Sequence, residues 1–269
     1  MEKLLHNKAA IITGAANGVG QIISQKFAEE GADLILADMD EENLKKEAEL
    51  LRKDGSNVEI FCGDLRKNLT IKNLLALSTK VFKKIDILVN ASRQVNISHP
   101  LNSDETFFEE SITQNVGVNL KLSTEVAKKM ISQNVNTAES VGPIGSIVNL
   151  SSIASHRTLP DTLAYSVSSA ALDQLTRSMA ISLAESGIRV NGVAIGSVMS
   201  SSLRAKLASQ KVNLEDLLTA TPLGRLGDAS EAAEAVLFLA SDRASFITGT
   251  ILNVDGGRSL LDRMPVAAY

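Results

Sequence analysis

Three glycines stand close together near the start of the chain, directly after its first apolar run, in Thr13-Gly14-Ala-Ala-Asn-Gly18-Val-Gly20. Gly14 would let the chain turn sharply, Gly18 would let the backbone approach a bound group, and Gly20 would let a helix pack closely on the preceding strand. The first turn of such a helix directs unpaired N–H groups at anions. The segment therefore predicts a diphosphate site formed by Gly14, Asn17, Gly18, Val19 and Gly20.

An acidic residue, Asp38, ends the second apolar run, 18 residues beyond Gly20. A carboxylate at this place accepts hydrogen bonds from the ribose of an adenosine and repels a 2′-phosphate. No lysine or arginine at 15–17 or 39 would neutralise that phosphate. Asp38 and the glycine turn therefore predict a dinucleotide site that prefers NAD to NADP. The alternative is that Asp38 only forms a turn or caps the next helix.

A second acidic residue, Asp64, follows the third apolar run, with Leu65 directly after it. At the same edge of a sheet, Asp64 would meet the adenine of the dinucleotide. An aspartate before a helical pattern is equally typical of a helix cap. The residues leave both interpretations open.

Short apolar strands alternate with longer segments of helical periodicity. We expect strands at 8–13, 33–37, 58–61, 85–89, 147–150, 188–194 and 250–254, and long helices at 66–83, 105–133, 162–186 and 229–240. The run 85–89 is almost continuously apolar, as strands are when helices cover both faces of a parallel sheet. No linker interrupts the alternation. The fold class is therefore α/β, a doubly wound parallel sheet in a single domain, 1–269.

Three segments have less regular patterns. Residues 132–144 are polar and form an expected loop, and residues 198–220 look helical but irregular. The tail 258–269 lies beyond a core of about 8–257, and we expect it to be poorly ordered or packed on a partner.

Composition excludes several classes of protein. The 269 residues carry a net charge of −4 with the basic residues spread along the chain, so no nucleic-acid partner is expected. One cysteine, Cys62, and three scattered histidines leave no disulfide framework and no metal site. No apolar stretch approaches the ~18 residues of a membrane span, and the N-terminus lacks a secretory signal. A cytoplasmic protein without a membrane partner is expected.

In the order of its motifs, the chain resembles the short-chain dehydrogenase/reductase family, which has a Rossmann-like fold, from about Lys8 to Gly257. The motifs are the glycine turn, Asp64, Asn90-Ala91, Ser151-Ser152, Tyr165, Arg189-Val190-Asn191 and Thr248-Gly249 with the following residues to Gly257. The resemblance implies hydride transfer between NAD(H) and a small carbonyl or secondary alcohol substrate. It also implies that the cofactor contacts Asn90, Ala91, Gly196 and Val198.

The family's chemistry uses an asparagine, a serine, a tyrosine and a lysine. Ser152 lies 13 residues before Tyr165, which is the family's spacing, and would hold the substrate oxygen. Tyr165 would be the general acid/base, and the chain's other tyrosine, Tyr269, is its last residue. Asn115 matches the family's helix asparagine better than Asn119 does, because its spacing from the neighbouring motifs is closer to the family's.

The lysine is missing, because the fourth residue after Tyr165 is Ser169. The family's lysine holds the nicotinamide ribose and stabilises the phenolate form of the tyrosine. The ordinary pKa of a tyrosine is about 10, so only about 0.1% is phenolate at pH 7. Arg177 is the next cation along the helix, two turns further on. We therefore expect a phenol without a cationic neighbour, a rate loss of about 10²–10³, and a gain of about tenfold or more on Ser169→Lys.

Other departures gather at the same end of the site. Ser92 replaces a family glycine and Arg93 follows it; a lone arginine in a loop is more often a solvated surface group. These departures support an alternative function, a catalytically impaired NAD-binding sensor or scaffold. The resemblance also implies a homo-oligomer, a tetramer or dimer paired through the helices 105–133 and 162–186.

Overall fold

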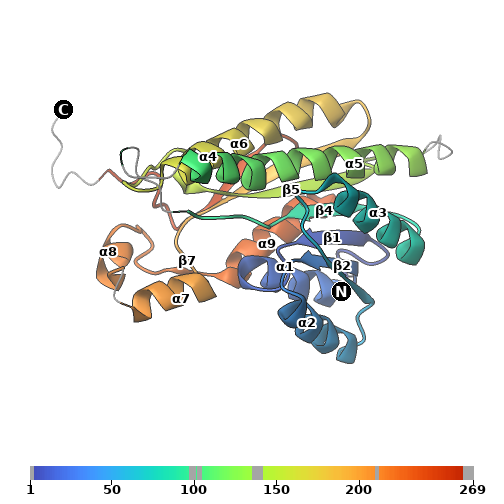
Figure 1. Ribbon diagram of the computed structural model, residues 1–269, viewed down its shortest axis with the longest axis horizontal. Helices are drawn as coiled ribbons and strands as arrows, with labels where there is room; N and C mark the ends of the chain where they lie inside the picture. Colours follow the sequence, from blue (N-terminus) through green and yellow to red (C-terminus); the bar gives the residue numbers. More distant parts are fainter. Residues whose placement is uncertain (1–2, 97–100, 102–104, 135–141, 210–211, 263–269) are drawn as a thin grey trace.

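Seven parallel strands form one sheet in the computed structural model, which describes residues 3–96, 101, 105–134, 142–209 and 212–262 (Figure 1). The strand order is β3-β2-β1-β4-β5-β6-β9. The chain therefore builds outward from β1 in one direction to β3, and then from β4 in the other direction to β9. This is the doubly wound α/β fold that the sequence predicts.

The bounds of the elements agree closely with the expected alternation. The first half comprises β1 (Ala9–Thr13), α1 (Gly18–Glu29), β2 (Asp33–Asp38), α2 (Glu41–Lys53), β3 (Val58–Cys62), α3 (Asn68–Phe82), β4 (Ile87–Asn90), α4 (Glu105–Ile112) and α5 (Val118–Gln133). The second half comprises β5 (Gly145–Ser152), α6 (Leu163–Ala184), β6 (Ile188–Ile195), β7 (Val198–Met199), α7 (Ser201–Ala208), α8 (Leu214–Thr219), β8 (Gly227–Asp228), α9 (Ala229–Ala240) and β9 (Ile251–Val254).

Helices cover both faces of the sheet, with α1, α2 and α9 on one face and α3, α5 and α6 on the other (Figure 1). Alternate residues of β1 show the reason. Ala10 and Ile12 pack with apolar side chains of α1 and α9, whereas Ile11 packs with those of α3 and α5. Because both faces of a central strand are buried, its sequence is continuously apolar. No helix in the described part of the chain is both long and apolar enough to cross a membrane.

The structure departs from the expected elements in two places. The segment 105–133 is helical throughout, as expected, but a π-helical turn at Thr113–Gly117 lies between α4 and α5. The irregular segment 198–220 contains the short strand β7, which pairs with β8, before α7 and α8. A strand of two residues has no periodicity to detect. Residues 135–141 of the expected loop lie outside the described residues.

The first residues of the C-terminal tail pack on the chain itself. Ser259 is buried, its N–H donates to Asp255 at 2.7 Å, and its carbonyl accepts from Arg157 Nε at 2.6 Å. The expectation of poor order is therefore wrong at Ser259, whereas a contact of the tail with a partner stays a prediction. Residues 263–269 lie outside the described residues.

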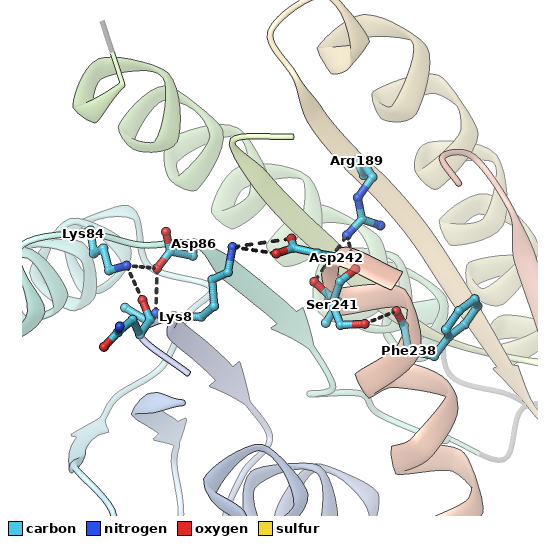
Figure 2. A network of polar contacts seen from close by, with 10 residues as sticks. Lys8, Lys84, Asp86, Arg189, Phe238, Ser241 and Asp242 are labelled. Atoms are coloured by element: carbon cyan, nitrogen blue, oxygen red, sulfur yellow. Dashed lines mark hydrogen bonds and ion pairs between the residues drawn. The ribbon is translucent and has the colours of Figure 1, made fainter. Parts of the chain in front are cut away.

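Polar side chains close the amino-terminal edge of the sheet (Figure 2). Lys8 pairs with Asp242 at 3.4 Å and Lys84 pairs with Asp86 at 2.9 Å. The buried Arg189 guanidinium donates to the last carbonyls of α9, those of Leu239, Ala240 and Ser241; burial lowers the pKa of Arg189 below its ordinary value. A cation satisfies the unpaired carbonyls of a helix end.

Candidate active site

The glycine turn lies between the carboxyl ends of β1 and β4, where the winding of the chain reverses direction. This switch point is where doubly wound sheets bind ligands. A Cβ at Gly14, whose φ is +67°, would lie 2.8 Å from the Ser92 nitrogen, and one at Gly20 would lie 2.1 Å from the Gly14 carbonyl oxygen. Neither position can carry a side chain without moving the backbone.

Gly18 differs from the other two glycines. Its φ is +61°, and a Cβ there would meet nothing within 4 Å. The side chain of Asn17, which precedes the first turn of α1, makes no capping hydrogen bond. The start of α1 therefore offers N–H groups and open space, as an anion-binding turn requires.

The Asp38 carboxylate is bound to the glycine turn. Its Oδ2 accepts from Ala16 N at 3.1 Å and its Oδ1 accepts from Met39 N at 2.7 Å. The cap of α2 is Asp40, whose Oδ1 accepts from Asn43 N at 3.1 Å. Asp38 is thus a turn residue at the rim of the cleft rather than a helix cap.

Asp64 and Leu65 line a hollow of about 250 Å³ that adjoins the glycine turn and also touches Asp38. Arg66 donates to both carboxylate oxygens of Asp64, at 2.8 and 3.0 Å, and this hydrogen bonding lowers the pKa of Asp64. The first helical residue of α3 is Asn68. Asp64 therefore binds the Arg66 side chain in the turn before α3 and does not cap that helix.

A cleft with a volume of about 550 Å³ runs along the carboxyl-terminal edge. It brings together most of the residues that the sequence singles out: Gly14, Asn17, Gly18, Val19, Gly20, Asp38, Ala91, Ser152, Tyr165, Gly196 and Val198. Gly196 admits no side chain, because a Cβ there would lie 2.4 Å from Asp255 Cβ. Asn90, Asn115 and Ser169 are buried behind the described lining of this cleft.

Tyr165 and Ser152 both line the cleft, and they come from different elements. Tyr165 lies in the first turn of α6 and is 8% exposed. Ser152 ends β5, and its Oγ accepts from Ala154 N at 3.2 Å. That bond uses the hydroxyl as an acceptor, so its proton is left to donate to a ligand.

The Tyr165 hydroxyl has a cationic neighbour. Arg93 Nη1 donates to Tyr165 Oη at 3.1 Å. The expectation of a phenol without a nearby cation is therefore wrong. Arg93 is itself exposed, as a surface group would be, but its guanidinium also contacts the phenol. Periodicity could not reveal the contact, because the two residues are 72 positions apart. The sequence did offer one signal for this contact: Arg93 follows β4 at the same edge of the sheet at which α6 begins.

Ser169 does not reach into the cleft. Its Oγ donates to the Tyr165 carbonyl, four residues earlier in α6, at 2.8 Å, and the residue is 4% exposed. Ser168 Oγ donates to the same carbonyl at 3.0 Å. This back-bonding to the preceding turn is common for serine within helices. The Ser169 hydroxyl therefore donates its proton within α6.

Asn115 lies in the π-helical turn and links two parts of the site. Its Oδ1 accepts from Gln94 N at 2.8 Å, while its Nδ2 donates to Gln94 O at 2.9 Å and to Ser168 Oγ at 3.0 Å. Asn119 donates to the Asn115 carbonyl at 2.8 Å, within the same helical segment. Of the two asparagines considered, Asn115 is therefore the one that joins the segment after β4 to α6.

The loop after β4 is held from the other side by Thr13, a residue that the sequence reasoning missed. Thr13 Oγ1 accepts from Ala91 N at 3.1 Å and from Ser92 N at 3.2 Å.

Asn90 donates to Ser123 Oγ and to Asn149 Oδ1, at 2.9 and 2.8 Å. Asn90 thus fixes neighbouring elements from within the core. Among the described residues, no cluster of three or more histidine, cysteine or acidic side chains could hold a metal ion.

Comparisons with known proteins agree with this geometry. A family model described as enoyl-(acyl carrier protein) reductase matches residues 14–259. An uncharacterised oxidoreductase of Thermotoga maritima is 36% identical, covering 93% of this chain and 96% of its own. The 3-oxoacyl-[acyl-carrier-protein] reductase FabG of Chlamydia muridarum is 33% identical, covering 96% of this chain and 99% of its own.

A similar solved structure is 7α-hydroxysteroid dehydrogenase complexed with NADH and 7-oxo glycochenodeoxycholic acid. It has a TM-score of 0.87 and 30% identity, and the match covers 95% of this chain and 96% of that one. The family model, the sequence relatives and this structure all match nearly the whole chain. The protein is an oxidoreductase that belongs to the short-chain dehydrogenase/reductase family.

Proposed function

We propose that the protein transfers a hydride between NAD(H) and a small carbonyl or secondary alcohol, with Tyr165 as the acid/base. The observation that carries the proposal is a single cleft with the glycine turn and Asp38 at one end and Ser152 and Tyr165 at the other. The solved 7α-hydroxysteroid dehydrogenase, which has NADH and an oxo compound bound, supports a nicotinamide cofactor.

The residues present fit such a cofactor. The open space at Gly18 and the first turn of α1 would take the diphosphate, and Asp38 would accept hydrogen bonds from the adenosine ribose. Asp64 and Leu65 border the hollow that continues past Asp38, where the adenine would lie. Gly196 and Val198 would border the nicotinamide. A carboxylate at Asp38 disfavours a 2′-phosphate, which supports NAD over NADP.

The chain's own groups would move the proton of the reaction. The bound cofactor supplies or accepts the hydride. Ser152 would donate a hydrogen bond to the substrate oxygen, and Tyr165 would give its proton to that oxygen in reduction or take it from the alcohol in oxidation. Asn115 is a positioning residue here, because its amide contacts Gln94 and Ser168.

Calorimetric titration followed by turnover assays tests this function. We expect NADH to bind more tightly than NADPH, and at least one member of a panel of ketones, aldehydes and secondary alcohols to be turned over. Failure of both dinucleotides to bind at millimolar concentration would refute the proposal. Binding without any turnover would favour the alternative, an impaired NAD-binding protein. That alternative rests on Ser169, whose hydroxyl is bonded within α6.

We further infer a homo-oligomer. Large apolar side chains remain exposed on α5 and α6, including Leu120, Ile131, Val167 and Ile181, the last 78% exposed. Exposed apolar helix faces are typical of subunit interfaces. Light scattering after gel filtration would give a dimer or tetramer mass, and a monomer across micromolar concentrations would contradict the inference.

A further inference from the structure

We propose that Arg93 replaces the missing lysine as the cation that stabilises the phenolate of Tyr165. The proposal rests on the proposed function for its role in catalysis. Its basis in the structure is the hydrogen bond from Arg93 Nη1 to Tyr165 Oη, 3.1 Å long, between an exposed arginine and a buried tyrosine that both line the candidate cleft.

The chemistry of the two groups determines the direction of this hydrogen bond. A guanidinium has donors and no acceptor, so the phenol oxygen must accept. The phenol's own proton is thereby left to point at another acceptor, such as a substrate oxygen. A hydrogen bond between two oppositely charged groups is stronger than one with a neutral partner. Arg93 therefore favours the phenolate over the phenol.

The loop that carries Arg93 is held in place by side chains from two sides. Thr13 Oγ1 accepts from the N–H groups of Ala91 and Ser92. The Asn115 amide makes two hydrogen bonds to the backbone of Gln94 and a third to Ser168, three residues after Tyr165 in α6. One buried amide therefore connects the loop of the cation to the helix of the phenol.

The other charged groups described on the elements around Tyr165 are exposed or have other partners. Of the described residues that line the cleft, the charged ones are Arg93 and Asp38, and Asp38 is bound to the glycine turn. After β5, the exposed His156 contacts Ser155, and Arg157 donates to the Ser259 carbonyl. Glu109 and Glu110 of α4 are exposed. Arg93 is thus the cation whose hydrogen bond to the phenol oxygen the structure records.

The proton and electron balance shows where this cation acts. In reduction the Tyr165 O–H bond breaks, the proton goes to the substrate oxygen, and the hydride reaches the carbonyl carbon from the reduced nicotinamide. The electron pair of the broken bond stays on the phenolate beside Arg93. Oxidation reverses each transfer and must begin from the phenolate. Arg93 acts only as a charge, because a guanidinium does not lose its proton near neutral pH.

A spectroscopic titration tests the contact without substrate or cofactor. The chain has two tyrosines and no tryptophan, so Tyr269→Phe leaves Tyr165 as the only source of phenolate absorbance. In that background we expect Arg93→Gln to raise the pH of half-ionisation of the phenol, and Arg93→Lys to raise it less. Circular dichroism at each pH verifies folding.

Arg177→Gln is the matched control for the loss of one positive charge. Arg177 is exposed on the same helix, 12 residues after Tyr165, which is about 18 Å along the axis. That exceeds the ~10 Å Debye length at 0.1 M salt, so this variant should leave the half-ionisation pH unchanged. An equal half-ionisation pH in the Arg93→Gln variant and its parent would overturn the proposal.

Kinetics show whether the contact operates during turnover. Arg93→Gln should shift the pH–rate profile of alcohol oxidation to higher pH and reduce kcat at pH 7 by about tenfold or more. Adding Ser169→Lys should restore most of the loss. A shifted titration with an unshifted pH–rate profile would overturn the catalytic role. A shifted titration in a protein with no turnover would refute the proposed function and leave the Arg93–Tyr165 coupling standing.

Discussion

The two ends of the cleft are built in different ways. At the end proposed to hold the adenosine and diphosphate, here called the adenine end, backbone groups and one carboxylate from the segment 13–38 form the surface, and Asp38 bonds directly to the turn at Ala16. At the other end, proposed to hold the nicotinamide and called the nicotinamide end, side chains from distant parts of the chain meet, with Arg93 following β4 and Tyr165 beginning α6. The first end has the glycine turn that the resemblance implies, whereas the second has Ser92, Arg93 and Ser169 where the resemblance implies other residues.

The two ends therefore differ in how strictly the backbone restricts the residue types that can stand there. A turn in which a Cβ would lie 2.1 Å from a backbone oxygen cannot change its glycine without moving the chain. A positive charge can be supplied from any element that reaches the phenol. The predictions below test that difference, from the largest expected effect to the smallest.

Tyr165→Phe should have the largest effect, because it removes the proton donor at the nicotinamide end. We expect kcat to fall by about 10²–10⁴ and the affinity for NADH to stay within about twofold. Steady-state kinetics and calorimetry measure the two quantities. Tyr269→Phe is the control and should keep full activity. Equal losses of activity and NADH affinity would show that the two ends are not separable.

Gly18→Ala tests the adenine end. The new Cβ would enter the space that the diphosphate needs, so we expect NADH affinity to fall by about 10- to 100-fold. Gly55→Ala is the matched control, because Gly55 also has a positive φ, +85°, and open space around it, but lies outside the cleft. Both variants should lose about 1–2 kcal/mol of unfolding free energy. An equal NADH affinity in the two variants would contradict the diphosphate assignment.

Asp38→Asn tests the preference between cofactors. The amide can still accept from Ala16 N but no longer repels a 2′-phosphate, so the affinity for NADPH should rise by about tenfold. Asp40→Asn removes the neighbouring charge and keeps a good helix cap, so it should change NADPH affinity much less. Tighter binding of NADPH than NADH by the unmodified protein would overturn the role of Asp38.

Glu231→Gln tests the outer support of the nicotinamide end. Glu231 completes the capping box of α9 and pairs with Arg225 at 2.7 Å, next to β8, which pairs with the strand that carries Val198. The hydrogen bond from Arg225 lowers the pKa of Glu231 from 4.5 to about 2. The charged Glu231 carboxylate therefore increases the free energy of unfolding. This contribution is complete above about pH 4.5 and is lost as the pH falls through about 2.

Because Glu231 is exposed, its substitution should cost less than about 1 kcal/mol at pH 7. The difference in unfolding free energy between Glu231→Gln and the parent should shrink between pH 4.5 and 2, as measured by urea denaturation. Glu49→Gln, on the exposed face of α2, is the control. A difference that grew on acidification would contradict the assignment.

Elements with strong local signals could be predicted from the sequence. The helix expected at 229–240 has the same bounds as α9, because Asp228 and Glu231 form the expected capping box. The long apolar strands were found because helices bury both of their faces. The π-helical turn was missed, because the hydrogen bonds of Asn115 to Gln94 and Ser168 join segments that no local pattern connects.

By itself, the sequence determined the alternating strands and helices, the glycine turn and the acidic residue that follows β2. Each depends on neighbours within one turn, one strand or one crossover, so residue type and spacing suffice. Only the tertiary structure decided which cation contacts Tyr165. The sheet brings the loop after β4 and the start of α6 to one edge, and it places Arg93 beside a phenol 72 residues away. A charge acts through space, so its position along the chain does not reveal its partner.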